Sequence, residues 1–143
     1  MNGVMDVVAG ILVRGDLVLA AKRSASMRWP GFWEFPGGKV EADETLDQAL
    51  IRELREELNI VVRAFYLWKV KEKTDRGTMI RLYFYLVTAF DGTPTPNEGQ
   101  ELSWFNAADA AGYEFLPADQ EVLVDLVSTS LSGAPFTEKL KLH

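Results

Sequence analysis

Residues 38–60 read GKVEADETLDQALIRELREELNI, and they carry the strongest structural signal in the chain. Its second half predicts an amphipathic helix, because a leucine recurs at every fourth position, at Leu46, Leu50, Leu54 and Leu58. Thr45 stands at the expected start of this helix, where a hydroxyl side chain is a favoured N-cap. We therefore expect the leucines to face the core and the rest of the chain to be organised around this helix.

Three glutamates, Glu53, Glu56 and Glu57, fall within one arc of this helix, on the flank of the leucine stripe. Like charges three or four residues apart repel by roughly 0.2–0.5 kcal/mol per pair, so three converging carboxylates need a compensating charge. A hard divalent cation with oxygen ligands, Mg²⁺ or Mn²⁺, supplies it. Just upstream, Gly37 and Gly38 allow a tight turn that can offer carbonyl oxygens to the same ion.

The glutamate run alone has a simpler explanation, a solvated acidic helix in which Arg52 and Glu56 form an i,i+4 ion pair. The full spacing favours a site: Gly38, five residues, Glu44, seven residues, Arg-Glu-Leu-x-Glu-Glu, and an aliphatic residue two places on. This pattern resembles the Nudix box of nucleoside-diphosphate-linked hydrolases. One position departs, since Asn59 stands where the family usually has Gly at the end of the helix. Asn is the next-best residue for a left-handed C-terminal position, so we expect a small stability cost and no functional loss.

The length and composition indicate one soluble globular domain. The chain has 143 residues, 48% of them hydrophobic and 25% charged, and we expect one domain over residues 1–132 with a loosely ordered tail at 133–143. Its 15 basic and 21 acidic residues give a net charge of −6. Without a basic run to follow a phosphate backbone, the chain is not expected to bind a nucleic-acid polymer. A small anionic ligand remains compatible, because a bound cation reverses the field locally.

Two missing residue types exclude several chemistries. The chain has no Cys, which excludes disulfides and thiolate sites, and its one His is the terminal His143, which excludes a Ser-His-Asp triad and a histidine-ligated zinc site. Catalysis must therefore use carboxylates, Arg, Lys, Tyr and metal. The N-terminus lacks the basic region of a signal peptide, and the apolar run at 7–13 is too short to span a bilayer. We expect a cytoplasmic protein that does not insert into a membrane; no feature predicts an oligomeric state.

Apolar and β-branched runs outside the helix predict strands. We expect strands at 7–13 (buried on both faces), 17–21, 61–70, 79–90 and 102–105, loops at 24–31, 71–78 and 91–96, a helical turn at 107–111, and a final helix beginning at 116–119.

Candidate substrate contacts precede the box. Arg23 is either a solvated strand end or a phosphate contact, as an Arg at this place is in MutT-like family members, and Arg28 is a weaker candidate for the same work. Trp33 and Phe35 are expected in the core by residue type. Glu34 and Phe35 belong to the segment that borders the base pocket in the resembled family, so both are also substrate-binding candidates.

Two acidic residues after the box complete the candidate site. Glu98 lies in a Gly-containing loop from which, in the resembled family, an acidic residue often ligates metal. Glu101 is the second candidate for this role. The alternative for both is an ordinary solvent-exposed side chain. Asp119 lies in the first turn of the last helix, where it either complements the helix dipole or, as in MutT-like enzymes, reads the nucleobase edge. An ionised carboxylate only accepts hydrogen bonds, which favours the amino group of cytosine or the N7–H of 8-oxoguanine.

The resemblance implies a Nudix fold of the α/β (α+β) class, a mixed β-sheet sandwiched between helices. It implies that Glu56 and Glu57, with a glycine carbonyl, hold Mg²⁺ or Mn²⁺, and that Glu53 is the catalytic base beside them. Arg52 would orient Glu53, and Lys39 would stabilise developing charge.

The reaction implied is cleavage of a (deoxy)nucleoside triphosphate to the monophosphate and pyrophosphate, acting on CTP or a modified pyrimidine nucleotide, with 8-oxo-dGTP as the close rival. An ADP-ribose or dinucleotide pyrophosphatase is an alternative within the fold. A non-catalytic nucleotide-binding module is disfavoured, because such modules typically lose box glutamates and this chain keeps them all.

Overall fold

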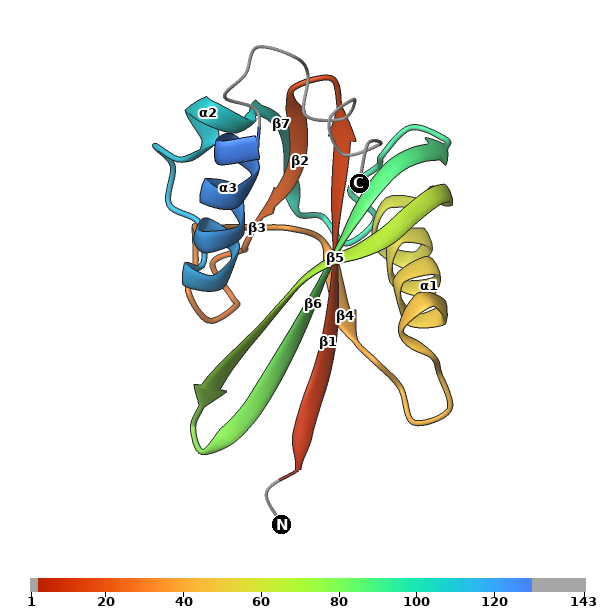
Figure 1. The fold of residues 1–143 in the computed structure, drawn as a ribbon, viewed down its shortest axis with the longest axis vertical. Coiled ribbons are helices and arrows are strands. Elements are labelled where there is room, and N and C mark those ends of the chain that lie inside the picture. The colour runs from red at the N-terminus through yellow and green to blue at the C-terminus, as the bar shows by residue number, and fades with distance from the viewer. Residues whose placement is uncertain (1–2, 130–143) are drawn as a thin grey trace.

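The structure, a computed structural model, describes residues 3–129 (Figure 1). In this part of the chain the elements follow one another as β1 (Val4–Arg14), β2 (Leu17–Lys22), β3 (Trp33–Glu34), β4 (Gly37–Lys39), α1 (Leu46–Leu58), β5 (Val61–Asp75), β6 (Thr78–Asp91), β7 (Glu101–Asn106), α2 (Ala107–Ala110) and α3 (Pro117–Thr129). The expected tail at 133–143 lies outside the described residues.

The strands form one mixed sheet in the order β3-β2-β1-β6-β5, with β4 pairing to β1 and β7 to β2. The pairing of β1 with β6 is parallel, and the other pairings are antiparallel. Figure 1 shows α1 on one side of this sheet and α2 with α3 on the other. The predicted architecture, a mixed sheet between helices, is therefore confirmed.

Strand β1 is the centre of both layers. Val8 and Leu12 belong to the apolar cluster under α1, whereas Ala9, Ile11 and Val13 belong to the cluster under α2 and α3. Alternate side chains of a strand point to opposite faces, so a strand covered on both sides has no polar alternation. This explains the unbroken apolar run in the sequence and confirms the predicted burial.

Helix α1 begins and ends as its sequence predicts. The Thr45 side chain accepts a hydrogen bond from the Gln48 amide while the Gln48 side chain accepts one from the Thr45 amide, which makes a capping box. Asn59 ends the helix with φ +57°, in the left-handed region. The α1 core residues are fully buried and include Leu50, Leu54 and Leu58.

One sequence prediction is wrong: residues 71–78 are not a loop. Strand β5 continues to Asp75, pairs with β6 along its length, and turns through only Arg76 and Gly77. Both turn residues have positive φ, +52° and +82°, which matches the twist of a two-residue hairpin. Residues 71–75 of this edge strand are exposed or half-buried and mostly charged, so the sequence lacks the apolar signal of a strand there.

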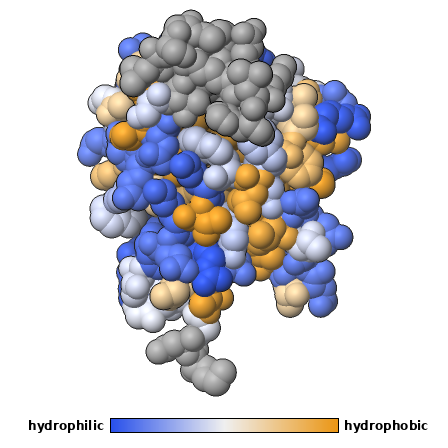
Figure 2. Space-filling model, in the orientation of Figure 1, coloured by the Kyte–Doolittle hydropathy of each residue, from blue (hydrophilic) through white to orange (hydrophobic). Residues whose placement is uncertain are grey.

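The surface in Figure 2 is mostly hydrophilic, with apolar side chains scattered over the long strands. In residues 3–129 no helix is long and apolar enough to cross a membrane.

Candidate active site

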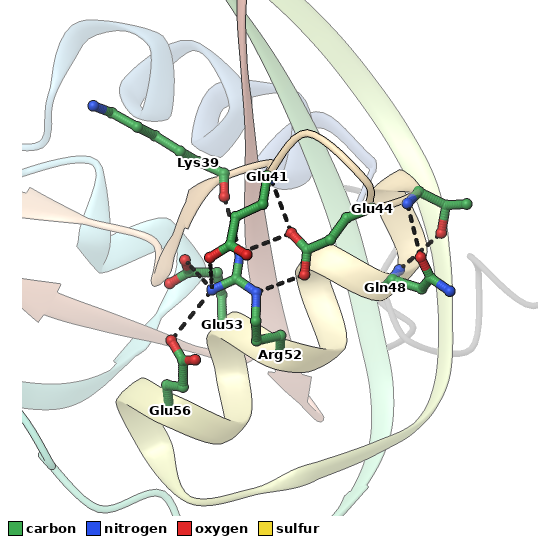
Figure 3. Close-up of polar contacts among 8 residues, drawn as sticks. Lys39, Glu41, Glu44, Gln48, Arg52, Glu53 and Glu56 are labelled. Carbon is green, nitrogen blue, oxygen red and sulfur yellow. Dashed lines mark hydrogen bonds and ion pairs between the residues drawn. The ribbon is translucent and has the colours of Figure 1, made fainter.

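Arg52 is the hub of the polar cluster on α1 (Figure 3). Its Nε donates to Glu44 at 2.6 Å, and its Nη1 donates to Glu53 at 2.9 Å and to Glu56 at 3.2 Å. Its Nη2 binds Glu44 at 2.9 Å and the carbonyl oxygen of Lys39 at 3.1 Å. One side chain thus ties the box helix to the segment that precedes it.

This cluster remains negatively charged. The hydrogen bonds from Arg52 and from the Glu41 amide lower the pKa of Glu44 to about 2. Arg52 also lies 3.6 Å from the Glu41 carboxylate, so a single guanidinium faces four acidic groups. The arrangement leaves negative charge for a cation to neutralise.

Glu53 packs against β4. Position 38 must be glycine for this, because a β-carbon on Gly38 would lie 2.5 and 2.6 Å from the two Glu53 carboxylate oxygens. Burial raises the pKa of Glu53, the Arg52 contact lowers it, and the negative charges of Glu56 and Glu98 raise it further. Glu53 is thus held in one place by Arg52 on one side and the glycine on the other.

Glu57 carries the clearest sign of a ligand. Its Oε2 is buried and has no hydrogen-bond partner in the described part of the chain. Burial, followed by the charges of Glu98 and Glu53, raises the pKa of Glu57 to about 8, against a lowering hydrogen bond with the Gly37 backbone. A buried carboxylate oxygen without a partner is costly, and a hard divalent cation is the partner that oxygen donors of this kind fit.

Carboxylates repel one another, and the box glutamates do not converge fully. Glu56 turns to Arg52 and is 57% exposed, whereas Glu57 points inward. Within residues 3–129, no group of three acidic or histidine side chains already stands at metal-binding spacing. The donor set fits a divalent ion by its chemistry.

The loop before β7 is fastened to the C-terminal end of α1. The Thr95 amide donates to the Leu58 carbonyl at 2.9 Å, and the Asn97 amide donates to the Glu57 carbonyl at 3.1 Å. The Asn97 side chain donates to the Glu56 carbonyl, also at 3.1 Å. These bonds satisfy helix-end carbonyls that lack partners within the helix.

This fastening sets Glu98 next to the box helix. Glu98 and Glu57 line the same cavity, where the negative charge of Glu98 raises the pKa of Glu57. The Glu98 amide donates to the Gln100 side chain at 3.0 Å. Glu101 instead begins β7, opposite Lys22. Of the two acidic candidates, the structure brings Glu98 to the site.

A cavity of about 440 Å³ lies beside these groups. Its lining contains Gly37, Gly38, Lys39, Glu57 and Glu98 from the box side, and Arg23, Arg28, Glu34, Phe35 and Asp119 from the other candidates. Of the predicted site residues, Arg52, Glu53 and Glu56 are not part of the lining.

Asp119 meets the segment before β4 although 84 residues separate them in sequence. Its Oδ2 accepts the Phe35 amide at 2.8 Å, and the residue is only 7% exposed. Burial raises the pKa of Asp119 to about 7, with the Phe35 amide lowering it and Glu34 raising it. Arg23 Nη1 in turn donates to both Glu34 oxygens at 3.0 Å. A buried acceptor and a paired acid thus face the cavity.

Two candidates have additional partners. Arg28 makes two hydrogen bonds to Asp75, at 2.8 and 3.3 Å, which join the loop between β2 and β3 to the β5–β6 hairpin. The Phe35 ring packs edge-on against Phe84 in the core, as expected for an aromatic residue, while its amide holds Asp119.

Sequence reasoning missed Met27, Trp29 and Lys73, which also line the cavity. Lys73 lies in the segment wrongly predicted as a loop. A large aromatic residue in an otherwise polar and Gly-containing loop was the available signal for Trp29.

Comparison with known proteins gives the chain its family. Residues 4–126 match the NUDIX domain. The chain is 40% identical to the CTP pyrophosphohydrolase of Escherichia coli over 119 residues, which cover 83% of this chain and 88% of that protein. It is 35% identical to the 8-oxo-dGTP diphosphatase of the same organism over 123 residues, covering 85% of this chain and 95% of that one.

Solved structures of similar proteins lead to the same family. The E. coli ORF135 protein superposes with a TM-score of 0.82 at 36% identity, covering 92% of this chain and 94% of that one. A MutT structure from work on Aliivibrio salmonicida and Vibrio cholerae gives a TM-score of 0.80 at 38% identity, covering 89% and 99%. The family model, these relatives and these solved structures point to one enzyme family, and the chain is a Nudix hydrolase of the MutT type.

Proposed function

We propose that the protein hydrolyses a (deoxy)nucleoside triphosphate to the monophosphate and pyrophosphate in a Mg²⁺-dependent reaction. The observation that carries this proposal is the buried, unpartnered oxygen of Glu57 beside a cavity that Asp119 also lines. The Glu57 oxygen can bind a cation, and the Asp119 carboxylate can accept a hydrogen bond from a donor. A nucleotide with its metal ion supplies both.

The metal-binding residues in this proposal are Glu56, Glu57, Glu98 and a carbonyl oxygen of Gly37 or Gly38, with Glu53 adjoining them. When bound, Mg²⁺ or Mn²⁺ supplies charge neutralisation on the phosphoryl oxygens and acidifies water. Glu56 must leave Arg52 to join this set, and its 57% exposure leaves it free to turn.

Glu53 is the proposed catalytic base. Its raised pKa favours taking a proton from the attacking water, and Arg52 with Gly38 fixes its direction. The Lys39 side chain points away from the Arg52 cluster in Figure 3, and it lines the cavity, where it can stabilise charge that develops on a phosphoryl group.

Asp119 is the proposed reader of the base. An N–H group of a bound base stabilises its ionised form, which accepts hydrogen bonds only. The amino group of cytosine fits this requirement, in line with a relative named CTP pyrophosphohydrolase. The N7–H of 8-oxoguanine fits as well, and the relatives named 8-oxo-dGTP diphosphatase make 8-oxo-dGTP the second candidate. Arg23 and Arg28 are proposed to contact phosphate, and Glu34 and Phe35 to border the base.

The test is a panel of canonical and oxidised (d)NTPs with ADP-ribose as the competing class, scored for Mg²⁺-dependent pyrophosphate release. We expect release from CTP or 8-oxo-dGTP to exceed that from the other substrates. Cleavage of ADP-ribose alone, or no Mg²⁺-dependent release from any triphosphate, would overturn the proposal.

Two variants assign roles within the same panel. Glu53→Gln should lower turnover by about 10²–10⁴-fold with near-normal nucleotide binding. Wild-type turnover in that variant would refute the base assignment. Asp119→Ala should change base preference more than turnover, and an unchanged preference would return Asp119 to a structural role at the start of α3.

A further inference from the structure

Two apolar side chains stand where the cavity opens to solvent. Met27 and Trp29 both line it, yet they remain 45% and 51% exposed. Both belong to the loop between β2 and β3, and neither has a role in the site as described above. Large apolar side chains left half in water at a cavity opening are an available binding surface.

The backbone at Trp29 is in an uncommon conformation. Its φ is +55°, in the left-handed region that bulky side chains rarely adopt. The Phe32 amide donates to the Trp29 carbonyl at 3.3 Å, and the two rings meet edge to face with centroids 5.4 Å apart. Such a conformation persists when the surroundings impose it, and it marks a candidate functional residue.

Several hydrogen bonds hold this loop. Arg23 Nε donates to the Arg28 carbonyl at 2.6 Å, and the Gly31 amide donates to the Arg23 carbonyl at 3.0 Å. From the other side, the Arg28 guanidinium holds Asp75 at the tip of the β5–β6 hairpin. Figure 1 shows this loop below α3 and the hairpin reaching down on the same side of the molecule. Trp29, adjacent to Arg28, therefore lies in a loop that is hydrogen-bonded on both sides.

The polar groups of the cavity leave one part of a nucleobase without a partner. Asp119 and Glu34 can meet the edge of a ring, but they do not cover its face. The Phe35 ring cannot serve, because it is buried against Phe84 and Phe115. Among the residues lining the cavity, Trp29 is the aromatic side chain that is still exposed.

We propose that Trp29 is the stacking platform for the nucleobase of the substrate, with Met27 extending the same apolar wall. This rests on the proposed function, since it requires a nucleotide in the cavity. Every base has a π-face, so stacking supplies affinity without selecting among bases. The division of work is then that Trp29 strengthens binding of all nucleotides and Asp119 distinguishes them.

The test compares Trp29→Ala and Trp29→Phe with wild type on CTP, 8-oxo-dGTP and dGTP. We expect Trp29→Ala to raise KM about tenfold for all three while kcat changes little, and Trp29→Phe to restore most of the affinity. Inorganic tripolyphosphate, which has no base, should inhibit wild type and Trp29→Ala with the same inhibition constant. Tyr113→Ala is the matched control, because Tyr113 is also aromatic and 51% exposed but does not line the cavity.

Tryptophan fluorescence gives a reading that is independent of turnover. In the Glu53→Gln background, CTP should quench emission, and adding Trp29→Phe should remove most of that quenching. Unchanged KM values for Trp29→Ala, an equal weakening of tripolyphosphate, or quenching that survives Trp29→Phe would each overturn the inference while NTP hydrolysis by wild type stands. A wild-type protein that hydrolyses no triphosphate would overturn the proposed function and this inference together.

Discussion

Gly38 on β4 and Glu53 on α1 are packed so closely that a β-carbon at position 38 would lie 2.5 and 2.6 Å from the two Glu53 oxygens. Sequence spacing places these residues in one motif, and their packing explains why position 38 is a glycine. It leaves room for the carboxylate of the helix to lie against the strand.

Gly38→Ala should therefore displace Glu53 rather than unfold the protein. A misplacement of about 1 Å can cost about 10²-fold in rate, so we expect turnover to fall by about that factor with a small change in Tm. Initial-rate assays and thermal unfolding measure the two effects.

Gly37→Ala is the matched comparison for this variant. There a β-carbon would overlap the backbone carbonyl of Val8 and lie 2.8 Å from the Cα of Ala9, so the sheet itself must shift. We expect a marked loss of Tm in Gly37→Ala. Wild-type turnover in Gly38→Ala would contradict the geometric role given to this glycine.

Asn97→Ala should weaken the response to Mg²⁺. The Asn97 side chain fastens the Glu98 loop to α1 through the Glu56 carbonyl, and without this bond Glu98 is held less well. We expect the Mg²⁺ concentration at half-maximal rate to rise several-fold, and the free energy of unfolding to fall by about 1 kcal/mol.

Thr95→Val is the control for the loop. The Thr95 hydroxyl donates only within the loop, to the Thr93 carbonyl, while its amide keeps the bond to Leu58. Its Mg²⁺ response should equal that of wild type. An unchanged Mg²⁺ response in Asn97→Ala would separate the loop anchor from the metal site.

Asp119 should make stability fall as pH rises from about 4 to about 7. Burial raises its pKa in the folded state from 3.8 to about 7, so between these values the folded protein binds more protons than the unfolded chain. The stabilisation is complete below the unfolded pKa and is lost through the folded pKa, by at most about 1.4 kcal/mol per pH unit.

Asp119→Asn cannot titrate at this site, and its side-chain oxygen can still accept the Phe35 amide. Urea unfolding at pH 5 and pH 7.5 should show a smaller drop in the free energy of unfolding for this variant than for wild type. Identical drops would mean that Asp119 does not carry this pH dependence.

Thr45→Ala should destabilise the box helix without touching the chemistry. Loss of the capping hydroxyl costs about 1 kcal/mol, and for a chain of this length we expect Tm to fall by about 3 °C. Thr45→Ser keeps the hydroxyl and should retain most of the stability. Turnover per folded molecule should be unchanged in both, because Thr45 does not line the cavity; a Tm for Thr45→Ala equal to that of wild type would argue against the cap.

Features that depend on neighbours along the chain were predictable from the sequence. The leucine period predicted α1, Thr45 and Asn59 marked its ends, and the box spacing indicated the family and the acids beside Gly38. These features follow local rules, because helix faces, caps and tight turns involve residues only a few positions apart.

Features that depend on distant partners became visible in the three-dimensional structure alone. It brought Asp119 to the Phe35 amide, continued β5 through 71–75 by pairing it with β6, and placed Trp29 at the opening of the cavity. Residues 71–75 form a strand because β6 supplies hydrogen-bond partners for their backbone groups. No local sequence pattern indicates that pairing. The physical reason is the same for all three: contacts across the chain arise from sheet register and packing, which appear only when the whole domain is assembled.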